Sequence, residues 1–373
     1  MKTPLKSFSH IVLGRTASTL SQAVFYFIFA FLLDPESFGA ITYWIAIAGV
    51  ASIASRFGLN HSIVVYQAKN NISFTNNVNT FSIIFISVIS LILLTVDIFI
   101  ALLSFSSSLF LMSIQNMIGL KKYKKFLKLN ILKGVLVVSL PILSYLYFDL
   151  SGILLGLSIS YLISSIDFFK ILKIKYFSLS FFRDNFKILF HNFGVDVSTT
   201  LVRFVDKLVI VPILGFSSLG IYQFNLQILI GMELIPMALH SFLLSEESSG
   251  RKHKKISICV IIISIVCAFS IILLSPIFIT EFLPKYVDGI LSLQILILSL
   301  IPLSISAIFN AKLQSKESTK VGFSALIRIG TLVIFLIILG ELYGLIGLSL
   351  AVLLSSIFYV IFLALIYNYE LKR

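Results

Sequence analysis

Long apolar runs recur along almost the whole chain, and they constrain its fold more than any other feature. A helix needs about 20 predominantly apolar residues to cross the hydrocarbon core of a bilayer. Twelve runs approach this length, and they lack the alternation typical of a membrane β-barrel. Their expected bounds are 11–33, 38–56, 81–97, 99–119, 130–148, 152–169, 192–214, 219–244, 257–279, 289–311, 321–340 and 343–367. The sequence therefore predicts an all-α integral membrane protein with about 12 transmembrane helices.

The composition agrees with this class. Hydrophobic residues make up 58% of the 373 residues and charged residues only 12%, whereas a soluble domain carries about 25% charged residues. The two cysteines, Cys259 and Cys267, lie in one apolar run and are expected to pack as small hydrophobic residues. Arg15 interrupts the first apolar run, so we expect a retained membrane helix there and not a cleaved secretory signal.

Basic residues indicate how the spans are oriented. With the N-terminus in the cytoplasm, the inward segments hold 22 of the 29 Lys and Arg residues, and the outward connections hold only Lys285. Cytoplasmic loops are enriched in Lys and Arg. The chain is therefore expected in the plasma (inner) membrane with both termini cytoplasmic. The remaining six basic residues lie within predicted spans: Arg15, Arg56, Lys133, Arg203, Lys207 and Arg328.

The net charge of +13 is accordingly a topology signal. Nucleic-acid binding requires a basic patch on one face of a domain, and no such footprint is expected here. The basic loops can attract anionic lipid head groups, so membrane lipids are expected partners.

An internal repeat divides the chain into two halves. "LLDPESFGAITYW" begins at Leu32 and "ILGFSSLGIYQFN" begins at Ile213. At an offset of 181 residues they match at three positions: Leu33 with Leu214, Ser37 with Ser218 and Gly39 with Gly220. Each stretch closes the first span of a six-span half, and an even number of spans gives both halves the same topology. We therefore predict two six-helix bundles, residues 1–178 and 179–373, related by a pseudo-two-fold axis along the membrane normal, with a substrate site between them.

Polar side chains follow one face of the first span in each half. In the second half they recur at helical steps of three, four and seven: Asp196, Thr199, Thr200, Arg203, Asp206 and Lys207. The same offset leads to a second stripe on the first span: Arg15, Ser18, Gln22 and Tyr26. Two facing stripes would line a wet cavity between the halves.

The charges near the middle of the seventh span are costly. Arg203 lies about 16 Å from the inner end of this span, and each charge at mid-bilayer costs about 2.5–3.5 kcal/mol on insertion scales. Arg203 and Asp206, three residues apart, can partly neutralise each other. This leaves Lys207 without a local partner. We expect a cationic cavity for an anionic substrate; a structural ion pair with a snorkelling lysine is the alternative.

Other charged residues within the spans are weaker candidates. Arg328 could face the cavity or snorkel to the cytoplasm, and Arg56 and Lys133 are expected to snorkel. Glu233, three residues before Pro236, could bind a proton or cation, but pairing with Arg203 or Lys207 is favoured slightly.

Enzymatic activity is not expected. The chain lacks the glycine-rich phosphate-binding loop of nucleotide hydrolases, and no loop is long enough to hold a soluble catalytic domain. The five histidines show no metal-binding spacing. No metal or cofactor is expected, and an H⁺ gradient, an Na⁺ gradient or the membrane potential remain open as driving forces.

Several stretches together resemble a known family. "LLDPESFGAITYW", followed by "FGLNHSIVVYQAK", is similar to the start of polysaccharide and O-antigen flippases of the Wzx type. In the second half, "RFVDKLVIVPILGFSSLGIYQFNLQIL" and "FLPKYVDGILSLQILILSLIPLSISAIFNAKLQSKEST" resemble the same family. The similarity covers most of the chain and rests on motif order and spacing. The family shares a superfamily with multidrug exporters and the lipid II flippase.

This resemblance implies a fold and a function. The implied fold is two six-helix bundles around a cationic cavity, and the implied substrate is an oligosaccharide linked to an isoprenoid (pyro)phosphate. Asp206 carries over as the characteristic position of the family's motif, and Arg203 and Lys207 carry over as cavity cations. The expected partners are this lipid-linked substrate and polysaccharide polymerases or glycosyltransferases, and the chain is expected to act as a monomer.

A multidrug or small-cation antiporter of the same fold is the alternative function. It would need acidic cavity residues to bind cations and to couple transport to H⁺ or Na⁺, and Asp196, Asp206 and Glu233 could serve. The neighbouring cations compete for these carboxylates. The glycan, the carrier lipid and the coupling ion cannot be identified from the sequence.

Overall fold

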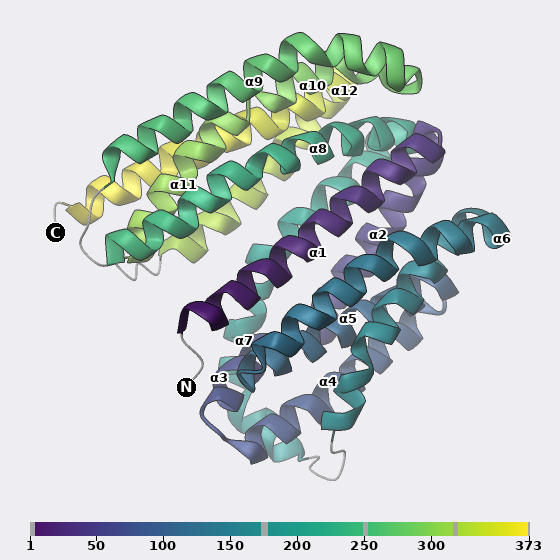
Figure 1. The fold of residues 1–373 in the computed structure, drawn as a ribbon, viewed down its shortest axis with the longest axis vertical. Coiled ribbons are helices and arrows are strands. Elements are labelled where there is room, and N and C mark those ends of the chain that lie inside the picture. The colour runs from purple at the N-terminus through teal and green to yellow at the C-terminus, as the bar shows by residue number, and fades with distance from the viewer. Residues whose placement is uncertain (1–3, 173–177, 249–252, 316–319, 372–373) are drawn as a thin grey trace. The chain divides into compact units, whose positions relative to one another are not determined.

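The computed structural model describes residues 4–172, 178–248, 253–315 and 320–371, and this part of the chain is almost entirely helical (Figure 1). The α-helices are α1 (Pro4–Leu32), α2 (Pro35–Arg56), α3 (Leu59–Ala68), α4 (Ile72–Leu93), α5 (Ile98–Gly119), α6 (Tyr123–Ile171), α7 (Leu179–Thr200), α8 (Val205–Ser248), α9 (Lys254–Phe282), α10 (Ile290–Ile297), α11 (Leu300–Ser315) and α12 (Lys320–Leu371). Two 3₁₀ turns join them, η2 (Leu201–Arg203) and η3 (Pro284–Gly289). Within the described ranges, eight helical segments are long and apolar enough to cross a membrane. The prediction of an all-α membrane protein is therefore confirmed at this level.

Three long helices contain a break in helical geometry. Asp149 in α6 has φ 48°, Gly215 in α8 has φ 77° and Gly344 in α12 has φ 58°. Positive φ values belong to the left-handed region, which glycine enters without steric cost and Asp more readily than most other residues. The breaks at Asp149 and Gly215 fall in short connections between predicted spans, and Gly344 is the second residue of the predicted span 343–367.

The chain reverses direction at these breaks. A side chain on Gly152 would overlap the backbone of Ser144, and one on Gly156 would overlap Pro141. The two residues of each contact lie at nearly equal distances along the chain from Asp149, one before it and one after it, as in an antiparallel hairpin. The segment α6 therefore consists of two helices packed against each other. Glycine at the contact lets the two backbones approach closely, as is typical of helix pairs in membranes.

Asp and Lys side chains satisfy free backbone groups at helix ends. Asp34 precedes Pro35, the first residue of α2, and its carboxylate accepts a hydrogen bond of 3.0 Å from the Ser37 N–H. This bond holds the pKa of the Asp34 carboxyl below its usual range. Lys285 Nζ donates to the carbonyl oxygens of Phe31, at 2.6 Å, and Leu33, at the end of α1. The single basic residue predicted to face outward therefore caps a helix C-terminus.

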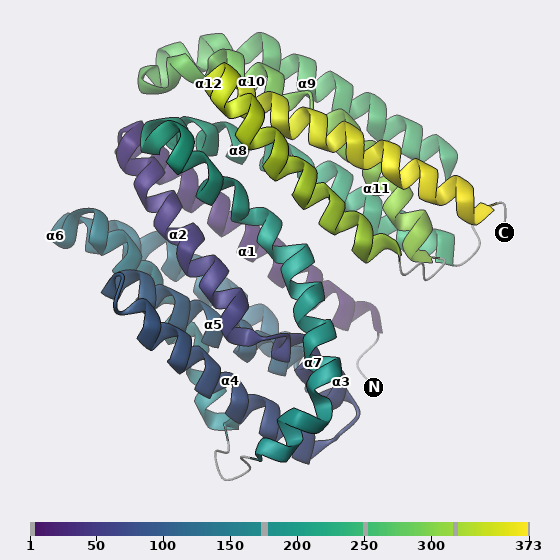
Figure 2. The same cartoon turned by 180° about the vertical axis from the view of Figure 1, so that it is seen from behind.

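The described chain forms two compact units. Unit 1 comprises Met1–Ile28 and Trp44–Phe204, and unit 2 comprises Phe29–Tyr43 and Val205–Arg373. Within unit 1, α7 packs against α3 (Figure 2). These boundaries differ from the predicted halves, because α7 groups with the first half and the α1–α2 turn groups with the second. The division into six-span bundles at residue 178 stays a prediction.

Each unit has its own apolar core. In unit 1, Leu59, Ile63, Val78, Leu109 and Phe168 are fully or almost fully buried in one cluster. The corresponding cluster of unit 2 contains Ile210, Leu219, Tyr222, Leu296 and Leu336. Close packing of these side chains stabilises each unit separately.

Two glycines at equivalent positions of the internal repeat lie against each other in unit 2. A Cβ on Gly39 of α2 would overlap the carbonyl oxygen of Phe216, and a Cβ on Gly220 of α8 would overlap the carbonyl oxygen of Pro35. Pro35 and Phe216 are themselves 181 residues apart, like the two glycines. The contact is therefore reciprocal, which an approximate two-fold axis between repeated hairpins would produce.

Alanine at Gly39 or Gly220 should destabilise the protein. The added methyl group meets rigid backbone on the partner helix, so we expect a loss of about 1–3 kcal/mol in the free energy of unfolding. Gly231 is the matched control, because a Cβ there meets no atom within 4 Å, and Ala at this helix position should stabilise by about 0.5–1 kcal/mol. Denaturant titration in detergent micelles measures all three variants. Equal stability of Gly39→Ala and Gly231→Ala would contradict the glycine contact.

Candidate functional site

The helical backbone is interrupted between α7 and α8. The α-helix ends at Thr200, the turn η2 follows, and α8 begins at Val205. Non-helical backbone at membrane depth is tolerated only where protein covers it or where it lines a wet cavity. Discontinuous membrane helices of this kind often form substrate or ion sites in transporters.

Arg203 is the last residue of this turn. Its side chain is exposed, and no carboxylate of the described residues lies within ion-pair distance of it. A guanidinium carries five N–H donors in a planar fork that matches a phosphate or carboxylate group. The interruption therefore presents a cation that is free to bind an anion.

Asp206 and Lys207 form a closed ion pair in unit 2. Lys207 Nζ lies 2.9 and 2.8 Å from the two carboxylate oxygens of Asp206, and the Tyr222 hydroxyl donates to the same carboxylate at 3.2 Å. Both charged residues are buried. The predictions that Lys207 lacks a local partner and that Asp206 neutralises Arg203 are therefore wrong. The helix break between Arg203 and Asp206 removes the helical spacing on which the second prediction relied.

Asp196 is also neutralised, within unit 1. Its carboxylate lies 3.2 Å from a guanidinium nitrogen of Arg56, and the Thr200 hydroxyl donates to it at 3.1 Å. His61 Nε2 is 3.7 Å away. Arg56 is only 3% exposed, so its predicted snorkelling is wrong. This pair holds the end of α2 to α7, and it leaves Asp196 without an open carboxylate face.

The polar stripe of α1 is partly exposed. Arg15 and Gln22 are exposed, whereas Tyr26 is buried. Tyr26 therefore does not extend the exposed part of the stripe. The side chain of Thr199 lies outside the described residues, and Thr200 is engaged by Asp196. Arg15 and Arg203, both in unit 1, are the exposed cations among the predicted cavity residues that the structure describes.

The two remaining predicted residues lie in unit 2. Arg328 is half-buried, and its guanidinium carbon lies 5.3 Å from the centroid of the Tyr359 ring. Such cation–π contacts fix the side chain and lower its need for a carboxylate. Glu233 is half-buried in α8, and Lys207, one of its two predicted partners, is paired with Asp206 instead.

Lys133 is a buried cation whose position differs from the one that the sequence predicts. It lies in the first half of α6 and is only 3% exposed, so the predicted snorkelling is wrong. Its Nζ donates to the Ser18 hydroxyl of α1 at 2.8 Å and lies 5.8 Å from the centroid of the Tyr161 ring. The neighbouring Gly134 faces Ser21 of α1. The sequence "LKG" offered one signal, since a glycine beside a lysine permits close approach of another helix.

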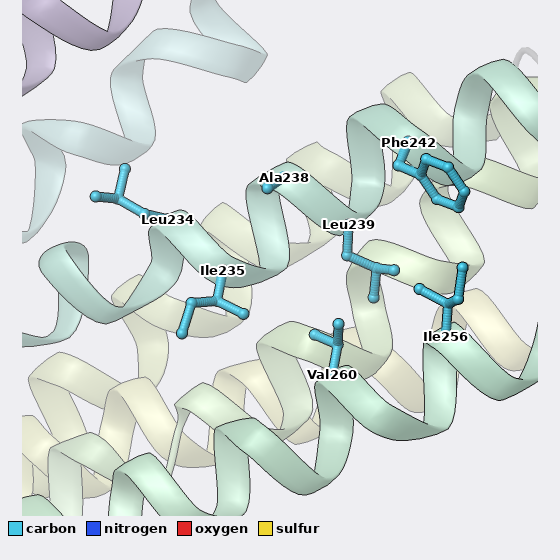
Figure 3. A pocket seen from close by; sticks show the side chains of 7 residues that line it. All are labelled: Leu234, Ile235, Ala238, Leu239, Phe242, Ile256 and Val260. Carbon is cyan, nitrogen blue, oxygen red and sulfur yellow. The ribbon is translucent and has the colours of Figure 1, made fainter.

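An apolar groove lies between α8 and α9 in unit 2 (Figure 3). Its volume is about 440 Å³, and its lining is wholly hydrophobic: Leu234, Ile235, Ala238, Leu239, Phe242, Ile256 and Val260. A groove without polar groups can accept hydrocarbon but offers nothing to a sugar or a phosphate. Among the described residues, no cluster of three or more His, Cys, Asp or Glu could hold a metal ion.

Part of the chain matches a known family, and most of it matches one relative. Residues 5–117 match the family model described as polysaccharide biosynthesis protein. The chain is 27% identical to the uncharacterized membrane protein MJ1375 of Methanocaldococcus jannaschii, over 94% of this chain and 95% of that protein.

Solved structures share the fold across nearly the whole chain. An inward-facing multidrug resistance MATE family transporter of the MOP superfamily matches with a TM-score of 0.71 and 14% identity, over 98% of this chain and 99% of that one. The lipid II flippase MurJ matches with a TM-score of 0.65 and 18% identity, over 98% and 87%. A MOP superfamily transporter from Pyrococcus furiosus, described as having a binding pocket of reversed polarity, matches with a TM-score of 0.61 and 16% identity, over 98% and 95%.

These matches show that the chain shares its fold with MATE transporters and the lipid II flippase MurJ, and that residues 5–117 are similar to the polysaccharide biosynthesis family. The resemblance inferred from the sequence is confirmed at this level. By their descriptions, these solved structures are transporters and a flippase.

Removing one member of the buried ion pair should destabilise unit 2. Asp206→Asn leaves the Lys207 ammonium buried without a counter-charge, and breaking such a pair costs about 3–5 kcal/mol. The double variant with Lys207→Met removes both charges and should recover a large part of this loss. The exposed pair Arg183–Asp184 is the control, because Asp184→Asn should cost about 0–1 kcal/mol.

The free energy of unfolding in detergent micelles measures this series. If Asp206→Asn and Asp184→Asn were equally stable, the ion pair would not contribute as the geometry indicates.

Proposed function

We propose that the chain is a flippase for an anionic oligosaccharide linked to an isoprenoid phosphate or pyrophosphate. The head group would pass from the cytoplasmic to the outer leaflet through a cationic cavity by alternating access. The observation that carries this proposal is Arg203, an exposed guanidinium at a helix interruption in a chain built almost wholly of apolar helices.

A count of twelve spans accompanies this proposal. Dividing the candidate spans at Asp149, Gly215 and Gly344 turns eight segments into eleven. In this count, α7 and the part of α8 before Gly215 together form one span. Helix α1, which is not among the eight segments, is the twelfth span. Twelve spans place both termini on the same side of the membrane, which the distribution of basic residues assigns to the cytoplasm.

The charges of unit 1 suit a phosphate-bearing substrate. Arg15 and Arg203 are exposed, and the Asp196 carboxylate of α7 is neutralised by Arg56. Gln22 adds amide hydrogen-bonding groups for hydroxyls of the sugar. A head group that leaves water must regain its hydrogen bonds, and these side chains can supply them.

The isoprenoid tail needs no polar lining. Hydrocarbon can remain in the bilayer while the head group crosses, and the α8–α9 groove offers apolar surface for part of the tail (Figure 3). The expected partners are the enzymes that make or consume the lipid-linked glycan. The chain would act as a monomer in the plasma membrane.

The alternative function is cation or multidrug antiport. It is less well supported, because the carboxylates it requires are paired with cations. Such a transporter needs acids that are available to a cation. Asp196 is bound to Arg56, and Asp206 is bound to Lys207 and Tyr222. Two of its three predicted acidic residues are therefore already neutralised.

Arg203→Gln should abolish flipping of lipid-linked oligosaccharide while leaving membrane insertion intact. Glutamine keeps hydrogen-bonding capacity but removes the charge, and we expect at least a tenfold loss, because a charge-assisted hydrogen bond contributes about 1.5–3 kcal/mol. Proteoliposomes containing a fluorescent isoprenoid-pyrophosphate oligosaccharide measure the rate. Arg183→Gln, on the exposed surface of α7, should retain the wild-type rate. A wild-type rate for Arg203→Gln would refute the assignment.

Expression of the chain should give no resistance to cationic drugs. An antiporter of the same fold would export them, whereas a cavity with exposed Arg15 and Arg203 repels cations. Growth of a drug-sensitive bacterial host across a series of ethidium concentrations tests this. Resistance that depends on Asp196 or Asp206 would favour the antiporter.

A further inference from the structure

Lys133 is buried inside unit 1 without a counter-charge. Within the ranges that the structure describes, no carboxylate lies within ion-pair distance of its Nζ. Of the three N–H donors of the ammonium, one reaches the Ser18 hydroxyl at 2.8 Å. The other close group is the face of the Tyr161 ring.

Among the described residues, the helices around Lys133 place no carboxylate within ion-pair distance of it, and Asp167 of α6 is paired with Lys125. From α1, Ser18 faces it, and Arg15 lies one turn away with a further positive charge. The second half of α6 contributes the neutral Tyr161. Helix α5 contains no Asp, Glu, His, Lys or Arg from Ile98 to Gly119.

This environment distinguishes Lys133 from the other buried basic residues. Arg56 and Lys207 are each balanced by a carboxylate and can stay charged. A buried ammonium without such a partner is strained in its charged form, and loss of the proton gives a neutral amine that fits an apolar site. The Ser18 hydroxyl can then donate to the amine instead of accepting from the ammonium, so the contact survives in both forms.

Ser18 also connects Lys133 to the exposed stripe of α1. It is half-buried and lies between Arg15 and Gln22 on the same helical face. A proton can therefore reach the amine from the wet side of α1 by way of the hydroxyl, without passing through the apolar core.

We propose that Lys133 is a proton-binding site that takes up and releases H⁺ during the transport cycle. The step is Lys–NH₃⁺ to Lys–NH₂ with release of one H⁺ to water on the α1 side, and its reversal. This step makes H⁺ the coupling ion of transport, and that part of the proposal rests on the proposed flippase function. Proton binding itself does not depend on that function.

Proton binding is measured without substrate. Purified full-length protein is reconstituted in liposomes on a solid-supported membrane, and a step toward acid pH drives a transient current as protons enter the protein. Wild type should give this current. Lys133→Met, which cannot bind a proton, and Lys133→Arg, whose guanidinium does not release one, should both lose it. Lys128→Met, on the exposed side of the same helix, should keep it.

A wild-type current from Lys133→Met or Lys133→Arg would overturn the proposal. Flipping by Lys133→Arg at the wild-type rate would also overturn the coupling role, because a fixed positive charge would then suffice. Arg203→Gln should lose flipping and keep the current. A failure of the proposed function and a failure of this inference are thus distinguishable.

Ser18→Ala keeps the test decisive if the Lys133 variants fold poorly. Removing the hydroxyl deletes the acceptor that stabilises the ammonium, so the midpoint of the current should move toward acid pH. Gel filtration of each variant in detergent checks the folded state. An unchanged midpoint in folded Ser18→Ala would contradict the site.

Discussion

A polar group that enters hydrocarbon is costly unless it finds a partner within the protein, and the rest of the structure depends on this constraint. Helices satisfy the backbone internally. The reversals occur at Asp149, Gly215 and Gly344, where the φ values are positive and the helical backbone geometry is interrupted. Glycines such as Gly156 then let the two arms of a hairpin approach closely. The interruption at η2 is different, because it ends in the exposed Arg203 and is not a reversal of the chain.

The same constraint orders the charged side chains. Buried carboxylates receive cations, as in the pairs of Asp196 with Arg56 and of Asp206 with Lys207. The first pair holds α7 to α2 within unit 1, and the Tyr222 hydroxyl holds Asp206 at the start of α8 within unit 2. Cations that are exposed remain available to a substrate. Lys133, buried with only a hydroxyl and a ring, fits neither group, and for this reason it carries the inference about protons.

Much of the helical plan could be predicted from the sequence. The predicted spans 130–148 and 152–169 correspond to the two arms of α6, and the connection between them contains the reversal at Asp149. The repeat placed Gly39 opposite Gly220 in the alignment, and the structure brings this pair into contact. Such features depend on local apolar length and turn residues. The division of the chain into compact units could not be predicted, because it depends on which helices pack together.

The sequence by itself determined the membrane class, the helical content, the repeat and the set of intramembrane charges. These follow from the cost of exposing polar groups to lipid, which acts on each segment separately. Only the tertiary structure decided which of those charges are neutralised. An unbroken helix through 196–207 would have paired Arg203 with Asp206, but the break at η2 leaves Asp206 to Lys207 and Tyr222. The partner of Lys133 lies 115 residues away on α1, a distance along the chain over which local spacing carries no information.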